Sequence, residues 1–288
     1  MKGGMNVKKG LILEGGAMRG MFTAGVMDVL MEAGIEFDGA VGVSAGAAFG
    51  CNYKSKQIGR VIRYNSRFCA DKRYSGFPVL LKEGNIFSTQ FCYDVVPNQY
   101  DVFDFDTFEN NPMEFFVVCT DVESGKAVDH KYEGREDHGF DWIRASASMP
   151  LVSQMVEIEG KKYLDGGISD SIPLRFFESE GYGKNVLVLT QPLGYVKKKN
   201  SLLPIMKRKY RKYPKLLEAV ESRDIIYNVT LRYIAEKERK GEILVIRPET
   251  ALDISKVEKD PEKLKAVYVQ GRLAASARLA EIKKYLEE

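Results

Sequence analysis

Residues 37–46 read Phe-Asp-Gly-Ala-Val-Gly-Val-Ser-Ala-Gly, and their pattern changes from strand-like to helical. The part up to Val43 is short and apolar, which predicts a buried β-strand. An alanine-rich run begins at Ala45 and predicts the start of a helix. Ser44 is therefore expected at a strand-to-helix turn.

The residues before this stretch have the same order. An apolar run covers residues 10–13, and a helix-period stretch extends from Phe22 to Met31. This βαβα alternation favours a mostly parallel sheet covered by helices on both faces. Because ligands of such sheets bind at the carboxyl ends of the strands, a functional site is expected just after Leu13 and Val43.

The sheet is expected to continue to about residue 190. Buried strands are predicted at Glu114–Thr120 and Asn185–Thr190, with a helix at Asp141–Ser148 between them. Residues 71–111 are rich in aromatic residues, Pro, Gly and Asn without a clear period. They are predicted to form loop and short helix, and they are a candidate lid over the site.

The composition changes after Gln191. Residues 197–215 carry nine basic residues and no acidic one, and Lys197–Ser201 looks like an exposed linker. Helical patterns at 215–240 and 261–286 follow, around a strand-like stretch at 242–246. We therefore predict a three-layer α/β/α domain at residues 9–190 and a mainly helical C-terminal extension at residues 191–288.

The composition also narrows the function classes. Of 288 residues, 44% are hydrophobic, which suffices for a large core, and the net charge of +3 is too small to indicate a nucleic-acid partner. No apolar stretch reaches the roughly 20 residues of a membrane-spanning helix, and the first residues lack the apolar core of a secretory signal. A cytoplasmic protein is expected. Four scattered cysteines and two histidines indicate neither disulfides nor a metal site, and no cofactor is expected.

Gly42-Val43-Ser44-Ala45-Gly46 matches the G-x-S-x-G pattern in the strand-to-helix context of a nucleophile elbow. The small residues permit a sharp turn that raises the Ser44 hydroxyl above the sheet, where the N–H of Ala45 faces a developing oxyanion. A glycine-rich turn without catalytic function is the alternative, and the pattern alone does not decide between the two.

A glycine-rich loop, Glu14-Gly15-Gly16-Ala17-Met18-Arg19-Gly20, follows the first predicted strand. Its successive N–H groups can bind an anion, either a nucleotide phosphate or the oxyanion of an acyl-transfer intermediate. Met21 and Phe22 stand where a P-loop needs Lys and Ser or Thr, which excludes that motif.

A Rossmann-like nucleotide-binding module stays open as an alternative. Gly15, Ala17 and Gly20 approximate G-x-G-x-x-G, and Asp38 lies near the position expected for a ribose-binding acid. This interpretation leaves Ser44 without a role.

Ser44 needs a proton acceptor, and the candidates are His130, His138 or a carboxylate. Both histidines lie in polar stretches typical of solvated side chains, and both precede Asp165, unlike the Ser-acid-His order of α/β-hydrolases. A triad that uses Asp106 or Asp121 stays open. Asp165 is followed by two glycines, which let a carboxylate approach another backbone closely, although Asp-Gly-Gly is also common in turns.

Together, Gly15–Gly20, Gly42–Gly46 and Asp165-Gly166-Gly167 resemble the patatin-like phospholipase family in order and spacing. Ala145–Pro150 and Ile168–Pro173 also look like the family's flanking sequences. The resemblance covers about residues 9–190, and the rest is similar to the C-terminal extension of a bacterial branch of the family.

The resemblance implies a lipid acyl hydrolase, a phospholipase A or lysophospholipase-type esterase with a Ser-Asp dyad and no metal. Ser44 would attack the ester carbonyl, Asp165 would act as general base, and an acyl-enzyme would then be hydrolysed. The loop Gly15, Gly16, Ala17, Arg19 and Gly20 would form the oxyanion hole, with donors on Gly16 and Ala17 and with Arg19 positioning the loop. A catalytically silent lipid-binding relative is the remaining alternative.

Two details of the resemblance give structural expectations. The family's loop commonly has a third glycine where this chain has Ala17, so either a negative φ at Ala17 or a different loop geometry is expected. An aspartate with a reference pKa of about 3.9 is a poor base for serine unless it is desolvated, so Asp165 is expected to be buried.

The family suggests a lipid or acyl-ester substrate, and residues 197–215 interleave apolar side chains with cations. Two interpretations stay open: a peripheral membrane contact through residues 197–215, or a solvated basic segment whose apolar residues pack on the main domain. Several apolar residues between 68 and 108 could line an acyl-chain pocket or simply pack in the core: Phe77, Leu80, Leu81, Phe87 and Phe91.

Overall fold

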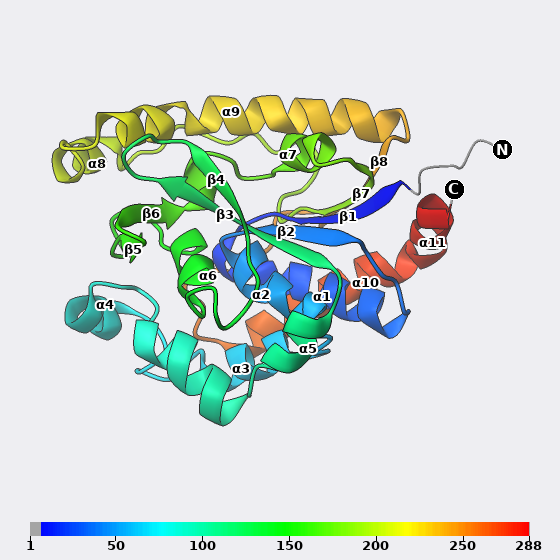
Figure 1. Cartoon of the computed structure of the whole chain (residues 1–288), viewed down its shortest axis with the longest axis horizontal. Coiled ribbons are helices and arrows are strands. Elements are labelled where there is room, and N and C mark those ends of the chain that lie inside the picture. The colour runs from blue at the N-terminus through cyan, green and yellow to red at the C-terminus, as the bar shows by residue number, and fades with distance from the viewer. Residues whose placement is uncertain (1–6, 288) are drawn as a thin grey trace.

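A mostly parallel sheet of eight strands lies at the centre of the computed structural model, which describes residues 7–287 (Figure 1). The spatial order is β5-β6-β3-β2-β1-β7-β8, and β4 pairs with β3 beside this path. The central strands β3, β2, β1, β7 and β8 run parallel, whereas β4, β5 and β6 pair antiparallel. The strands are β1 (Lys8–Leu13), β2 (Gly39–Val43), β3 (Glu114–Asp121), β4 (Ala127–Lys131), β5 (Val156–Ile158), β6 (Lys161–Asp165), β7 (Tyr182–Val188) and β8 (Ile243–Ile246).

Helices cover both faces of this sheet, which confirms the predicted α/β/α class (Figure 1). The α-helices are α1 (Gly20–Glu32), α2 (Ala45–Lys54), α3 (Arg60–Phe68), α4 (Phe77–Glu83), α5 (Phe105–Asn110), α6 (Asp141–Ser146), α7 (Leu174–Ser179), α8 (Leu203–Lys209), α9 (Pro214–Arg239), α10 (Pro261–Ala277) and α11 (Leu279–Glu287). Three short elements complete the list: η1 (Ala17–Arg19), the π-helix η2 (Phe91–Tyr100) and η3 (Gly166–Ile168).

Alternate residues of β1 enter different cores. Leu11 and Leu13 pack with α1, α2 and α10, whereas Ile12 packs with α7 and α9. Successive side chains of a strand point to opposite faces, so a strand covered on both faces must be apolar at every position. This explains why the strand patterns at 10–13 and 39–43 are continuous rather than alternating.

The sequence suggested that the sheet ends near residue 190, but the sheet continues beyond it. β8 pairs in parallel with β7, so the segment after residue 191 supplies an edge strand. The C-terminal segment also packs on the face of the sheet that α1 covers, where Tyr268 of α10 donates a hydrogen bond to Asp28 of α1 at 2.7 Å. The helical patterns at 215–240 and 261–286 correspond to α9 and to α10 with α11. The segments before and after residue 191 share one sheet. The domain boundary at residue 191 stays a prediction.

Two other segments differ in detail from expectation. Residues 71–111 contain α4, η2 and α5, which is more helix than their sequence indicated. Lys197 is half-buried, although Lys197–Ser201 was expected to be an exposed linker. Within residues 7–287, no helix is both long enough and apolar enough to cross a bilayer. The expectation about a secretory signal rests partly on residues 1–6, which lie outside the described residues.

Candidate active site

Ser44 lies at the turn between β2 and α2, with φ +56° and ψ −120°. A non-glycine residue with positive φ is strained, and such strain is held only where the surroundings fix it. Gly46 allows the turn to pack against β1, because a Cβ there would overlap the carbonyl oxygen of Leu13. The Ser44 side chain is thereby held at the carboxyl end of the sheet, as the sequence predicted.

A serine on another helix supports this turn. The backbone N–H of Ser44 donates to Oγ of Ser146 at 2.8 Å, and that hydroxyl donates to the carbonyl of Val118 on β3 at 2.6 Å. Both hydrogen bonds are buried. Ser146 therefore ties the elbow to the neighbouring strand.

The glycine-rich loop lies directly beside Ser44. A Cβ on Gly15 would lie 2.8 Å from the carbonyl oxygen of Val43 and 3.0 Å from Cβ of Ser44, so only glycine fits there. Within residues 7–287, the N–H groups of Gly15, Gly16 and Ala17 make no hydrogen bond. These three donors are available to an oxyanion beside the Ser44 hydroxyl.

Ala17 corrects one expectation. Its φ is +50°, so the expectation of a negative φ at Ala17 is wrong, and the other expectation, a different loop geometry, stays a prediction. The alanine instead adopts the left-handed conformation that a glycine would take without steric cost. The N–H of Arg19 donates to the carbonyl of Gly16 at 3.1 Å, and Gly20 begins α1, so both residues close the loop.

Asp165 ends β6 close to Ser44, whose hydroxyl is one of the groups that oppose the rise of the Asp165 pKa on burial. Its side chain is anchored by the N–H of Gly167 at 2.8 Å, and its backbone N–H donates to the carbonyl of Ser148 at 2.9 Å. Asp165 is only 5% exposed, which confirms the predicted burial. Loss of solvation raises the pKa of Asp165, and the charge of Arg223 on α9 is the largest opposing influence.

Glu14 holds the start of the glycine-rich loop in place through buried hydrogen bonds. This buried carboxylate accepts hydrogen bonds from the N–H of Thr190 at 2.6 Å and from the Tyr227 hydroxyl at 2.5 Å. The Thr190 hydroxyl also donates to the carbonyl of Gly15 at 3.1 Å. Because Tyr227 belongs to α9, the C-terminal segment helps to position the loop.

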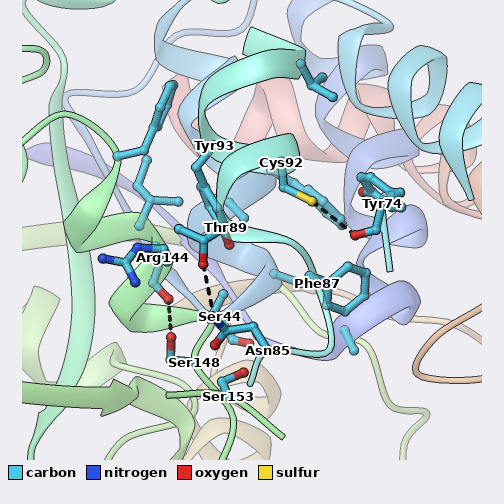
Figure 2. Close-up of a pocket in the computed structure, with 18 of the residues that line it drawn as sticks. Ser44, Tyr74, Asn85, Phe87, Thr89, Cys92, Tyr93, Arg144, Ser148 and Ser153 are labelled. Atoms are coloured by element: carbon cyan, nitrogen blue, oxygen red, sulfur yellow. Dashed lines mark hydrogen bonds between the residues drawn. The ribbon is translucent and has the colours of Figure 1, made fainter. Parts of the chain in front are cut away.

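An apolar cavity of about 120 Å³ opens beside Ser44 (Figure 2). Figure 2 shows Ser44 beside the polar side chains of Asn85 and Ser148, with the aromatic side chains of Tyr74 and Phe87 to one side. Of the residues that could either line an acyl-chain pocket or pack in the core, Phe87 lines the cavity and Phe91 is buried without lining it, whereas Phe77 and Leu81 are exposed on α4. Apolar and aromatic residues of the lining include Phe49, Tyr64, Tyr74, Phe87, Tyr93, Val96 and Ile143.

The alternative residues lie elsewhere. His130 contacts Asp137 at 2.7 Å and stacks on Trp142, and His138 contacts Glu159 at 3.3 Å. Neither histidine lines the cavity that contains Ser44. In residues 7–287 no group of three or more His, Cys, Asp or Glu side chains is arranged to hold a metal ion.

Asp38, the candidate ribose-binding acid, also lies away from the loop. It precedes β2 and accepts a hydrogen bond from the N–H of Lys9 at 2.7 Å, at the amino end of β1. The loop of residues 14–20 follows the carboxyl end of the same strand. The geometry therefore removes the acid on which the nucleotide-binding interpretation depended.

Several residues of the site could not be found by sequence reasoning. Ser146 lies in the stretch 145–150 that resembles the family, but nothing in that stretch indicates a contact with Ser44. Thr190, Tyr227 and Arg223 reach the site from segments whose sequence carries no functional pattern. Glu14 had one signal, a carboxylate directly after a buried strand.

Comparisons with known proteins agree with this geometry. A family model described as patatin-like phospholipase matches residues 11–177, and one described as a domain of unknown function (DUF6363) matches residues 213–287. Over 193 residues the chain is 32% identical to the uncharacterized protein YjjU of Escherichia coli (strain K12), covering 63% of this chain and 52% of that protein. Over 180 residues it is 27% identical to lysophospholipase NTE1 of Meyerozyma guilliermondii, covering 61% of this chain and 12% of that protein.

The chain thus spans about half of the first of these relatives and a small part of the second. Among solved structures, VipD from Legionella pneumophila superposes with a TM-score of 0.44 and 13% identity, covering 94% of this chain and 67% of that one. This likeness is too distant to support an argument about the site.

Proposed function

The chain belongs to the patatin-like phospholipase family, and on that premise we propose that it is a lipid acyl hydrolase of the phospholipase A or lysophospholipase type. One observation carries the proposal: the buried carboxylate of Asp165 lies close to Ser44, whose hydroxyl partly offsets the rise that burial causes in the pKa of Asp165. A serine needs such an acceptor to become a nucleophile.

In this mechanism Oγ of Ser44 attacks the ester carbonyl carbon, and its proton passes to Asp165. The carbonyl oxygen becomes an oxyanion, which the N–H groups of Gly16 and Ala17 stabilise, with Gly15 as a further donor. The tetrahedral intermediate expels the alcohol, which takes the proton from Asp165. A water molecule then attacks the acyl-enzyme with Asp165 as base, and a fatty acid is released with Ser44 restored.

The raised pKa of Asp165 supports this role. Burial makes the carboxylate a stronger proton acceptor than an aspartate in water, which brings it closer to the proton affinity that general-base catalysis needs. Arg223 and the N–H of Gly167 oppose the shift and keep the carboxylate ionisable.

The apolar cavity would receive the acyl chain. A cavity of about 150 Å³ holds one benzene molecule, so a cavity of about 120 Å³ accommodates only about six carbon atoms. Residues 74–97 form much of its wall. We therefore infer that longer chains require residues 71–111 to move, which is the lid function expected for them.

We also infer a peripheral membrane contact through residues 197–215. Leu203, Met206 and Tyr210 pack inward, whereas Ile205 on α8 is 56% exposed among basic residues. Figure 1 shows α4, with exposed Phe77 and Leu81, at the same end of the molecule. Apolar side chains surrounded by cations favour an anionic bilayer surface. Inward packing is observed for three side chains of the segment, and the membrane contact is proposed for its exposed side chains.

Vesicle flotation tests this contact. We expect Ile205→Glu to weaken binding to vesicles that contain anionic phospholipid, and salt to weaken it further. The matched control is Leu273→Glu, because Leu273 on α10 is similarly exposed at 65%. Equal binding by both variants, or by neutral vesicles, would contradict the contact. The cytoplasmic location and the absence of a nucleic-acid partner stay predictions.

The mechanism is tested by intact-mass analysis after treatment with a fluorophosphonate probe, together with turnover of p-nitrophenyl butyrate. We expect one label on the wild-type protein, none on Ser44→Ala and slow labelling of Asp165→Asn. Full activity of Asp165→Asn would end the dyad proposal. Thermal stabilisation by nucleotides, without labelling of folded protein, would instead favour the nucleotide-binding module.

A further inference from the structure

Three cationic side chains converge beside Ser44 and Asp165. Arg19 comes from the glycine-rich loop, Lys197 from the segment after β7, and Arg223 from α9. A terminal nitrogen of Arg223 lies 3.1 Å from where a Cβ on Gly167 would be. The Lys197 ammonium interacts with the charges of both arginines, and Asp165 interacts with those of Arg223 and Lys197.

Within the described part of the chain, these cations are not paired with carboxylates in salt bridges. The Nε atoms of Arg19 and Arg223 are buried and make no hydrogen bond. Among residues 7–287, none of the three side chains forms a salt bridge, whereas many other cations of the protein do. Lys197 instead lies 4.0 Å above the ring of Tyr227. A buried charged donor without an acceptor is unfavourable, so an anion at this place would be stabilising.

The nearby carboxylates do not neutralise the group. Glu14 uses both oxygens to accept hydrogen bonds from Thr190 and Tyr227, and Asp165 accepts one from the N–H of Gly167. Burial, and then the charge of Arg223, lower the pKa of Lys197 to about 8. Among the neighbouring charges, those of Arg223 and Arg19 lower the pKa of Lys197, and that of Glu14 raises it.

The position of the cations relative to Ser44 restricts what they can bind. The cavity is lined from η1, α2, α3, η2, α6 and the loops beside them, and its lining includes Arg60 and Arg144 but none of the three cations. Arg223 belongs to α9, on the opposite face of the sheet from α2 (Figure 1). An ester whose acyl chain enters the cavity would direct its alcohol portion away from it, towards these cations.

We propose that Lys197 and Arg223, together with Arg19, bind the phosphate group on the alcohol side of a phospholipid or lysophospholipid whose ester carbonyl lies at Ser44. This assignment rests on the proposed function and names its substrate class. Phosphate suits the site because guanidinium groups bind its oxygens in pairs and an ammonium adds a compact charge. The C-terminal segment then has a function in substrate selection, because it supplies two of the three cations.

The test compares two soluble esters with the same acyl chain, 1-octanoyl-glycerol 3-phosphate and 1-octanoyl-glycerol, at concentrations below micelle formation. The readout is the ratio of their kcat/KM values, which does not depend on the folded fraction of a sample. We expect the wild type to favour the phosphorylated ester by at least 10-fold. Arg223→Gln and Lys197→Met should each lower that ratio about 10-fold, with Arg223→Lys in between.

Matched controls are Arg232→Gln on the exposed side of α9 and Lys263→Met on α10, which should keep the wild-type ratio. Equal rates for both esters, or a ratio that survives in Arg223→Gln and Lys197→Met, would overturn the proposal. Competitive inhibition by inorganic phosphate without preference for the phosphorylated ester would assign the site to free phosphate instead, and would overturn it too.

Absence of turnover for both esters, with no fluorophosphonate label on Ser44, would refute the hydrolase rather than the anion site. Calorimetric titration with 1-octanoyl-glycerol 3-phosphate then decides the site separately. Binding by the wild type and loss of binding in Arg223→Gln would support it, and equal binding by both would reject it.

Discussion

The hydroxyl of Ser146 accepts a hydrogen bond from the backbone N–H of Ser44 at 2.8 Å, although 102 positions separate the two residues. The same hydroxyl donates to the carbonyl of Val118 on β3. The strained backbone at Ser44 is thus held by a polar side chain and not only by packing, which is how an unfavourable φ of +56° persists.

Replacement of this hydroxyl should affect both stability and rate. Ser146→Ala leaves the N–H of Ser44 and the carbonyl of Val118 without their partner, and we expect a loss of about 1–3 kcal/mol in the free energy of unfolding. We also expect a lower kcat, because the elbow is free to relax. Urea unfolding and ester turnover measure the two effects. Ser179→Ala, at an exposed position, is the control. An unchanged kcat in Ser146→Ala would show that the turn at Ser44 keeps its conformation without the Ser146 hydroxyl.

The pH dependence of kcat/KM should report Asp165. The base must be ionised, so activity falls as pH decreases through its pKa, and burial places this fall at a higher pH than for an aspartate in water. Because Arg223 lowers the pKa of Asp165, Arg223→Gln should move the fall further up the pH scale. The exposed Arg232→Gln should leave it in place. A shift to lower pH in Arg223→Gln would contradict this electrostatic relationship.

Asp165→Asn should be less active and more stable. As general base, the carboxylate contributes about 10²–10⁴-fold to the rate. Its raised pKa means that the folded protein holds the proton more tightly than the unfolded chain, so the ionised form destabilises the fold above that pKa. Asparagine keeps an acceptor for Gly167 without the charge. A gain of about 1 kcal/mol raises Tm by about 2–4 °C, and a lower Tm at neutral pH would count against the argument.

Two tyrosines on α9 give a matched comparison. Tyr227 donates to Glu14 beneath the catalytic loop, and Tyr233 donates to Glu178 on α7 at 2.6 Å. Tyr227→Phe leaves a buried carboxylate without one of its donors, and we expect about 1–3 kcal/mol lower stability together with a lower kcat. Tyr233→Phe, at a half-buried pair, should leave kcat unchanged. Equal kcat values for the two variants would show that the hydrogen bond from Tyr227 to Glu14 does not affect turnover.

Ala17 provides a stabilising substitution. At φ +50°, Ala17→Gly removes the steric cost of the left-handed conformation and should increase the free energy of unfolding by about 1 kcal/mol, with turnover retained because the N–H remains. Ala17→Val should act in the opposite direction, since a β-branched residue tolerates this conformation least. Urea unfolding of both variants checks the order, and greater stability of the valine variant would contradict it.

The sequence predicted the parts of the protein that depend on local pattern. Continuous apolar runs bounded by glycine identified β1 and β2, and the position of Ser44 between strand and helix identified the elbow. The contribution of β8 to the sheet was missed because the sequence of a short edge strand between two long helices does not indicate which strand it pairs with. Tyr227, Arg223 and Lys197 were missed for a similar reason. Tyr227 hydrogen bonds to Glu14, and the charges of Arg223 and Lys197 lower the pKa of Asp165. No periodicity in α9 or in the basic segment encodes these long-range interactions.

The dependence of Glu14 on Tyr227 also concerns the order in which the protein is made. Ser44 and Asp165 leave the ribosome before the helix that secures their loop, and β8 and α10 follow later still. At about 5–20 residues per second, synthesis from residue 165 to residue 227 takes roughly 3–12 seconds. In the proposed mechanism, a nascent chain therefore carries Ser44 and Asp165 for that time before Tyr227 can donate its hydrogen bond to Glu14. The proposed site is complete only after α9 has been synthesised.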